Sequence, residues 1–166
     1  MQEARNQYHA KKYAQAISLY SQALEMRPDP VNSAMLYNAR GTAKMDAEDH
    51  SAAIADFDRA LGLRPTETWT LNMAAWLRAT SRDPAARDGK VAVQQATRAC
   101  ELTNWKDPDI VDTLAAAHAE AGDFERAVER QQQAIKIAPW PDRMRMHERL
   151  RLFQQRAPYR QKERRR

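Results

Sequence analysis

The chain has 166 residues, enough for one domain with a buried core, and its single cysteine, Cys100, leaves no internal disulfide to form, so we expect a reducing, cytoplasmic setting. Hydrophobic residues make up 43% and charged residues 30%, and no apolar run reaches the length of a membrane span, so we expect no membrane insertion. The net charge of +5 is concentrated after residue 139, where ten Lys or Arg accompany three acidic residues, while residues 1–139 are slightly acidic.

One helical pattern recurs along the chain. Only four glycines and many alanines predict helix almost throughout. Four stretches carry apolar residues at the same helical spacing, namely residues 13–28, 50–65, 90–103 and 124–139. They align on one alanine in each copy, 35 to 39 residues apart: Ala16, Ala53, Ala92 and Ala127. A period of this length indicates a repeat protein.

A second amphipathic run precedes three of these stretches, so we expect each repeat to be a hairpin of two helices. A small residue at one equivalent position permits close packing of the two helices: Gly41, Ala75 and Ala115. Asp49 and Asp123 stand where each second helix should begin and can cap it. Prolines stand where three of the second helices should end: Pro28, Pro65 and Pro139.

This pattern resembles the tetratricopeptide repeat, a helix–turn–helix unit of about 34 residues. The resemblance rests on Tyr37, Gly41, Ala53, Phe57, Ala60 and Pro65 in one repeat and on Leu114, Ala115, Gly122, Ala127, Ala134 and Pro139 in another. Residues 71–128 also resemble a C-terminal arrangement of bacterial tetratricopeptide proteins that is often appended to larger multidomain chains. Gln131 replaces the usual aromatic residue, Glu48 replaces the usual turn glycine, and residues 80–89 form an inserted loop.

The resemblance implies an all-α fold, a right-handed superhelix of helical hairpins with three full repeats and a partial N-terminal one. The expected repeats are residues 1–28, 31–65, 68–103 and 108–139. A capping helix over 141–157 would cover the last apolar edge and complete a domain of residues 1–157. Residues 158–166 have little to bury, so we expect a mobile basic tail.

In this family the first helix of each hairpin lines a concave groove that binds peptides, so the resemblance implies a protein or peptide partner. The groove positions carried over are Met35, Asn38, Thr42, Met45, Trp69, Asn72, Trp76, Asp109, Asp112 and Glu120. The tryptophans could anchor a ligand or merely pack against the next hairpin. The three acidic residues would favour a basic ligand, or simply form a solvated acidic face.

We therefore expect a non-catalytic interaction scaffold, with no catalytic residue, metal site or cofactor. The four histidines fall in different repeats, and Cys100 lies on the apolar stripe of its helix.

Two alternatives concern the basic C-terminal end. A nucleic acid or acidic partner could bind the capping helix and the tail residues Arg160, Lys162, Arg164, Arg165 and Arg166. The basic end could also dock on the acidic part of the groove, within one molecule or between two copies, so a homo-oligomer formed through the groove or the C-terminal helix stays open.

Overall fold

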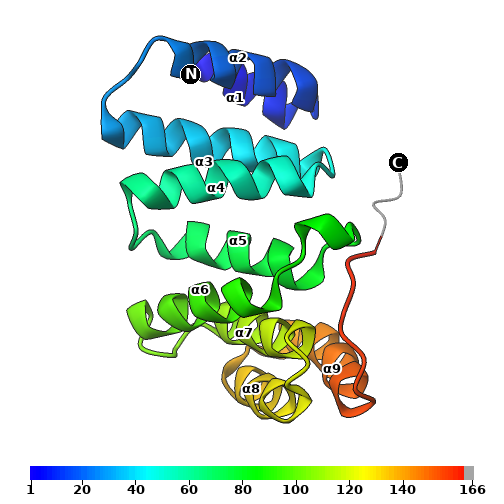
Figure 1. Ribbon diagram of the computed structural model, residues 1–166. Helices are drawn as coiled ribbons and strands as arrows, with labels where there is room; N and C mark the ends of the chain where they lie inside the picture. The colour runs from blue at the N-terminus through cyan, green and yellow to red at the C-terminus, as the bar shows by residue number, and fades with distance from the viewer. Residues whose placement is uncertain (163–166) are drawn as a thin grey trace. The chain divides into compact units, whose positions relative to one another are not determined.

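The structure is a computed structural model that describes residues 1–162 (Figure 1). Within this range the regular structure consists of helices without any strand, so the prediction of an all-α fold is confirmed. The chain folds into two compact units, Met1–Thr70 and Leu71–Arg166, called unit 1 and unit 2 below. The boundary lies within helix α5 (Thr68–Thr80).

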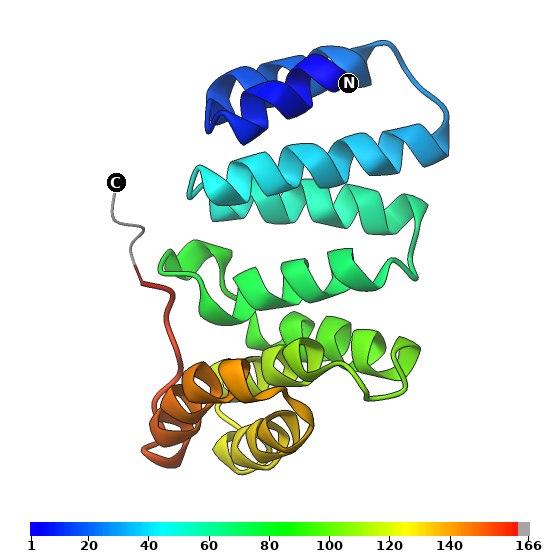
Figure 2. The ribbon, with the colours of Figure 1, turned by 180° about the vertical axis from the view of Figure 1, so that it is seen from behind.

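Unit 1 contains two helical hairpins. The first pairs α1 (Gln2–His9) with α2 (Tyr13–Glu25), and the second pairs α3 (Pro30–Asp46) with α4 (His50–Leu63). α1 has only eight residues, in agreement with the partial first repeat predicted from the sequence. Helix α2 also packs on α3, so the two hairpins lie side by side (Figure 2).

Local signals explain the ends of these helices. The Asp29 carboxylate accepts backbone hydrogen bonds from Val31 and Asn32 at the start of α3. Asp49 accepts one from Ala52 at the start of α4, as predicted. The turn between α3 and α4 passes through Glu48, whose φ of 64° lies in the left-handed region that glycine normally occupies. The residue that departs from the repeat pattern therefore keeps the backbone conformation of the pattern.

The two helices of the second hairpin approach closely at Gly41. A Cβ atom at this position would lie 2.8 Å from Cε1 of Phe57, which is fully buried in α4. Only a residue without a side chain fits beside that ring. The small residue and the aromatic residue that the sequence pattern singles out are therefore one contact in space.

A buried carboxylate lies next to this contact. Asp56 is fully buried and receives hydrogen bonds from Nε and Nη2 of Arg40, at 2.8 and 2.7 Å, while Lys44 Nζ lies 2.7 Å away. Burial alone would raise the pKa of Asp56, but the hydrogen bonds from Arg40 and Lys44 more than offset it and lower that pKa. Asp56 is therefore ionised at neutral pH and ties α4 to α3.

Unit 2 continues the helical arrangement from Leu71 of α5. It contains the short 3-10 helix η1 (Pro84–Ala86), α6 (Gly89–Leu102), α7 (Pro108–Glu120), α8 (Phe124–Ile137) and α9 (Trp140–Gln154). Each of the helices α6 to α9 packs on the next, and every residue from 110 to 119 in α7 is buried. α7 is therefore the central element of this unit.

The last helix and the residues after it complete unit 2. α9 buries Met146, Arg149 and Phe153, and packs on α8 and α7. After α9 the chain turns back and runs in extended form to the C-terminal end of α5 (red in Figures 1 and 2). Residues 158–162 are called the tail segment below.

Candidate peptide-binding surface

The predicted groove residues of unit 1 lie along α3 and at the start of α5. Met35 and Trp69 occupy equivalent positions of successive repeats and expose 42% and 44% of their surface. Thr70 Oγ1 donates a 3.0 Å hydrogen bond to Asn38 Oδ1, which holds the start of α5 beside the middle of α3. Thr42 and Met45 are half-buried further along α3. In unit 1 the predicted residues thus form one row, called the α3 row below.

The Trp69 ring is held by its neighbour rather than free to rotate. It packs edge-on against Phe57, with 5.8 Å between ring centroids and an interplanar angle of 86°. An exposed aromatic side chain with a fixed orientation loses little entropy when a ligand covers it. Trp69 therefore has the character of an anchor residue.

In unit 2 the predicted groove residues are already in contact with the C-terminal part of the same chain. Asp112 accepts hydrogen bonds from Arg149 of α9, Nε to Oδ1 at 2.9 Å and Nη2 to Oδ2 at 2.7 Å. Gln131 of α8 donates a third, at 2.6 Å. Burial raises the pKa of Asp112, and the charge of Arg149 together with the Gln131 hydrogen bond opposes that rise. Gln131, which replaces the aromatic residue of the repeat pattern, is thus a partner of this carboxylate.

The other two acidic groove residues are also paired with arginines of the C-terminal part. Arg145 of α9 lies 2.5 Å from Asp109, and Arg160 of the tail segment lies 2.6 Å from Glu120, which Arg87 also approaches to 3.0 Å. All three predicted acidic positions are therefore neutralised from within the chain. This is the docking of the basic end on the acidic residues that the sequence analysis left as an alternative, here within one molecule.

The tail segment adds contacts to α5. The ring of Tyr159 lies 5.8 Å from that of Trp76, and the Arg149 guanidinium lies over both rings, at 5.4 and 5.5 Å. The Gln161 backbone N–H donates to the Thr80 carbonyl at 3.0 Å, and Gln161 Nε2 donates to Thr80 Oγ1 at 2.8 Å. Residues 159 and 161 of the tail segment thus lie against α5.

The remaining basic tail residues have less to contact or are not described. Lys162 is exposed and lies 3.9 Å from the exposed Glu148. Arg164, Arg165 and Arg166 lie outside the described residues.

Asn38, Asn72 and Asp112 occupy equivalent positions of successive repeats, three residues before Gly41, Ala75 and Ala115, but they lie in three different environments. Asn38 is hydrogen-bonded to Thr70, and Asp112 is in the buried ion pair. Asn72 is buried, and its Oδ1 has no hydrogen-bond partner among the described residues. Of the three, the amide of Asn38 is the most accessible to a ligand.

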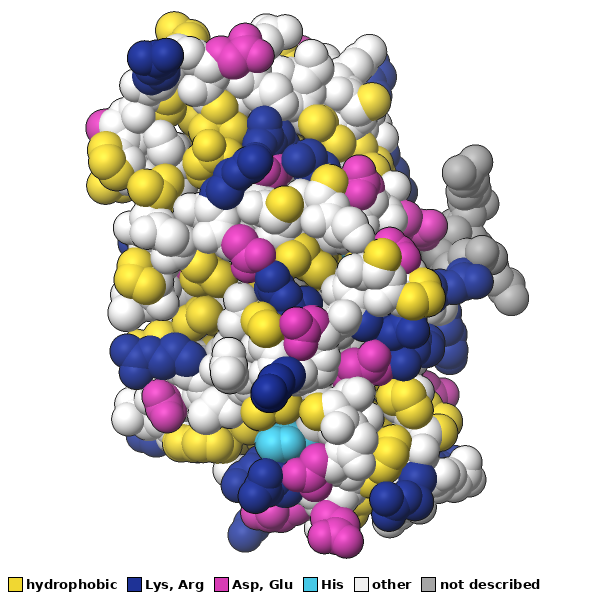
Figure 3. Space-filling model, viewed as in Figure 1, with side chains coloured by type: hydrophobic (Ala, Val, Ile, Leu, Met, Phe, Trp, Pro, Cys, Tyr) yellow, Lys and Arg dark blue, Asp and Glu magenta, His cyan; other side chains and the backbone are white. Residues whose placement is uncertain are grey.

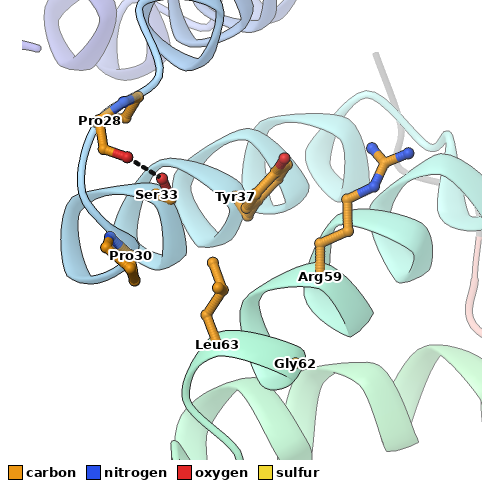
Figure 4. Close-up of a pocket in the computed structure, with 7 residues that line it drawn as sticks. All are labelled: Pro28, Pro30, Ser33, Tyr37, Arg59, Gly62 and Leu63. Atoms are coloured by element: carbon orange, nitrogen blue, oxygen red, sulfur yellow. Dashed lines mark hydrogen bonds between the residues drawn. The ribbon is translucent and has the colours of Figure 1, made fainter.

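A shallow pocket of about 470 Å³ lies elsewhere in unit 1 (Figure 4). Its lining residues are Pro28, Pro30, Ser33, Tyr37, Arg59, Gly62 and Leu63. Ser33 Oγ donates a 3.0 Å hydrogen bond to the Pro28 carbonyl, and Arg59 lies over the Tyr37 ring. Sequence analysis did not identify this pocket, because its residues come from the loop before α3, from α3 itself and from the end of α4 rather than from one helix face.

One part of the chain matches a known protein family, and the fold resembles two solved structures. The family model described as "Tetratricopeptide repeat" matches residues 35–67, the second hairpin of unit 1. These residues therefore form a tetratricopeptide repeat. Two solved structures with 18% and 19% sequence identity, titled "Crystal structure of MamA protein" and "Crystal structure of MamA", have TM-scores of 0.74 and 0.75. The matches cover 92% and 93% of this chain and 78% and 84% of the MamA chains, so most of this chain has the same helical fold as MamA. No curated protein matches the sequence.

Two side chains of types that often take part in catalysis, Cys100 and His118, are buried in unit 2. Cys100 is fully buried, and burial raises the pKa of its thiol to about 12, so the thiol is protonated at neutral pH. Burial also lowers the pKa of His118. Within residues 1–162, no group of three or more His, Cys, Asp or Glu is arranged to hold a metal ion. None of the helices in that range is both long enough and apolar enough to cross a membrane.

One face of the molecule carries charges of both signs. On the face drawn in Figure 3, Lys and Arg side chains are interspersed with Asp and Glu side chains, and hydrophobic side chains lie between them. Mixed charges of this kind do not form the broad basic stripe expected of a nucleic-acid-binding face.

Proposed function

We propose that this tetratricopeptide-repeat protein is a non-catalytic scaffold that binds a polypeptide partner on the α3 row of unit 1. The observation that carries the proposal is the exposure of Met35 and Trp69 at equivalent positions of two successive repeats. In unit 2 the corresponding positions are engaged by α9 and the tail segment. We therefore assign the binding role to the α3 row, where Met35 and Trp69 are exposed, rather than to the predicted groove residues of unit 2.

The α3 row offers the mixture of groups that a peptide-binding surface uses. Met35 and Trp69 supply apolar contact area, and the half-buried Asn38 amide between them supplies hydrogen-bonding groups for a ligand backbone. The Thr70–Asn38 hydrogen bond and the Phe57–Trp69 ring contact fix Asn38 and Trp69 before the ligand arrives. Such preorganisation lowers the entropic cost of binding.

Nucleic-acid binding by the basic C-terminal end is not favoured by the contacts. Arg145, Arg149 and Arg160 each lie against a carboxylate of α7, at 2.5 to 2.7 Å. An arginine already paired with a carboxylate is not available to neutralise a phosphate without breaking that pair.

The proposal is tested with matched double variants. First, cross-linking and mass spectrometry identify a partner captured from the source cells. The affinity of that partner is then measured for the Met35→Lys/Trp69→Ala variant and for the control Met144→Lys/Trp140→Ala, whose residues on α9 are 77% and 79% exposed. We expect the first variant to lose at least tenfold in affinity and the control to keep it, with unchanged helical circular dichroism in both. Equal affinities of both variants and the unaltered chain would refute the α3 row as the binding surface.

A further inference from the structure

We infer that unit 2 carries a second peptide-acceptor site, and that residues 159–161 of the tail segment are its replaceable occupant. The acceptor site is defined by Trp76 and Thr80 of α5 and Glu120 of α7, with Arg87 and Arg149 beside them. Its external ligand would be an extended peptide in which an aromatic residue precedes an arginine. This site is separate from the α3 row, so it extends the proposed function of polypeptide binding to another surface.

The first recognition element is a backbone contact. Thr80 is the last residue of α5, and the final carbonyls of a helix lack partners within the helix. Gln161 N–H donates to this carbonyl at 3.0 Å, and the Gln161 side chain also reaches the Thr80 hydroxyl oxygen at 2.8 Å. Any extended peptide can make the backbone contact, so this part of the site selects conformation rather than sequence.

The second element selects the side chains. Arg160 lies 2.6 Å from the Glu120 carboxylate, and Arg87 holds the other oxygen of that carboxylate at 3.0 Å, so the group is fixed in place. Arg87 belongs to the inserted loop that distinguishes the third repeat from the family pattern. The tilted Tyr159–Trp76 ring contact adds a preference for an aromatic residue immediately before the arginine.

The tail segment is bound less firmly than the helix before it. α9 is fixed by the fully buried Met146 and Phe153 and by the buried Arg149, whereas Tyr159, Arg160 and Gln161 are only half-buried and follow the end of the last helix. Segments with few buried apolar contacts open locally without global unfolding. The tail segment can therefore leave the acceptor site while α9 stays in place.

Occupation by a tethered segment has a quantitative consequence. A tethered ligand competes at an effective concentration in the millimolar range, so it weakens the apparent affinity for any external peptide. Weakening the tail's own contacts must therefore strengthen the binding of a peptide supplied in trans. A tail that merely packs on the surface, with no acceptor site beneath it, gives no such gain.

The experiment uses full-length chains and a synthetic peptide of residues 157–162, Ala-Pro-Tyr-Arg-Gln-Lys. Binding is followed by NMR through the indole N–H signal of Trp76. We expect the Tyr159→Ala/Arg160→Ala chain to bind the peptide at least tenfold more tightly than the unaltered chain. A Lys162→Ala chain, altered at an exposed tail residue, should bind like the unaltered chain.

Two further arms test the recognition chemistry. Adding Glu120→Gln to the tail variant should remove most of its gain in peptide affinity, and so should replacing arginine by glutamate in the peptide. Equal peptide binding by the tail variant and the unaltered chain, or binding that ignores both changes, would overturn the inference. Every residue altered in this experiment lies in unit 2, whereas Met35 and Trp69 lie in unit 1. Failure of this test therefore does not bear on the partner affinity of the Met35 and Trp69 variants, and the two proposals are judged separately.

Discussion

Replacing Arg149 by alanine should strongly destabilise unit 2. The side chains of Arg149 and Asp112 are 7% and 6% exposed and make two hydrogen bonds to each other, so removing the arginine leaves a buried carboxylate with Gln131 as its remaining side-chain donor. Breaking a buried ion pair from one side costs about 3–5 kcal/mol. The contacts of Arg149 with Trp76 and Tyr159 are lost as well, so we expect the upper part of this range.

The assay is urea-dependent hydrogen exchange of the α7 amides, which reports the opening of unit 2. With an m-value near 2 kcal/mol/M, a loss of 4 kcal/mol lowers the midpoint by about 2 M urea. Arg145→Ala is the matched control, because the Arg145–Asp109 pair lies on the same two helices with 50% and 60% of the side chains exposed. Exposed pairs contribute about 0–1 kcal/mol.

The apolar double variant Arg149→Met/Asp112→Leu should recover most of the loss, since it leaves no unpaired charge. A cost below about 1 kcal/mol for Arg149→Ala, or a cost equal to that of Arg145→Ala, would refute the view that this pair fixes α9 on α7.

Two further predictions concern unit 1. Gly41→Ala should lower the free energy of unfolding by about 1–3 kcal/mol because the new methyl group meets Phe57 at 2.8 Å. Gly62→Ala should raise it by about 0.5–1 kcal/mol because nothing lies within 4 Å of the new methyl group. Urea titration measures both changes, and equal effects would contradict the packing argument. The lowered pKa of Asp56 means that its ion pairs stabilise the unit fully above the carboxyl's unfolded pKa of about 3.9 and are lost as pH falls through the folded pKa. The stability difference between the unaltered chain and Asp56→Asn should therefore shrink on acidification below about pH 4, and a constant difference would contradict the assignment.

The repeat pattern predicted the features that each hairpin shares with the others. The caps at Asp49 and Asp123 both accept the expected backbone hydrogen bonds, at 3.2 and 3.1 Å. Gly41 faces Phe57 as the pairing of a small and a large residue requires. Such contacts follow from periodicity because a repeat pattern places the same type of residue at the same position of several units.

Contacts that differ between repeats could not be predicted in this way. Equivalent repeat positions have different surroundings at Asn38, Asn72 and Asp112, because the neighbouring residues come from different elements. Periodicity shows which side of a helix is covered, not which side chain covers it. The division into two units was missed for the same reason, since it does not recur along the chain.

One non-repeated contact nevertheless follows the repeat period. Asp109 pairs with Arg145 and Asp112 with Arg149, at separations of 36 and 37 residues, which lie within the 35 to 39 residues between successive repeats. The two pairs follow the same order along both helices, so α9 runs parallel to α7. The first helix of a further hairpin would have this direction. Helix α9 thus takes the place of the first helix of a fifth repeat, and Arg145 and Arg149 lie opposite Asp109 and Asp112 because they occupy equivalent positions one repeat later. Sequence analysis could have found this pairing by extending the alignment one period beyond Pro139.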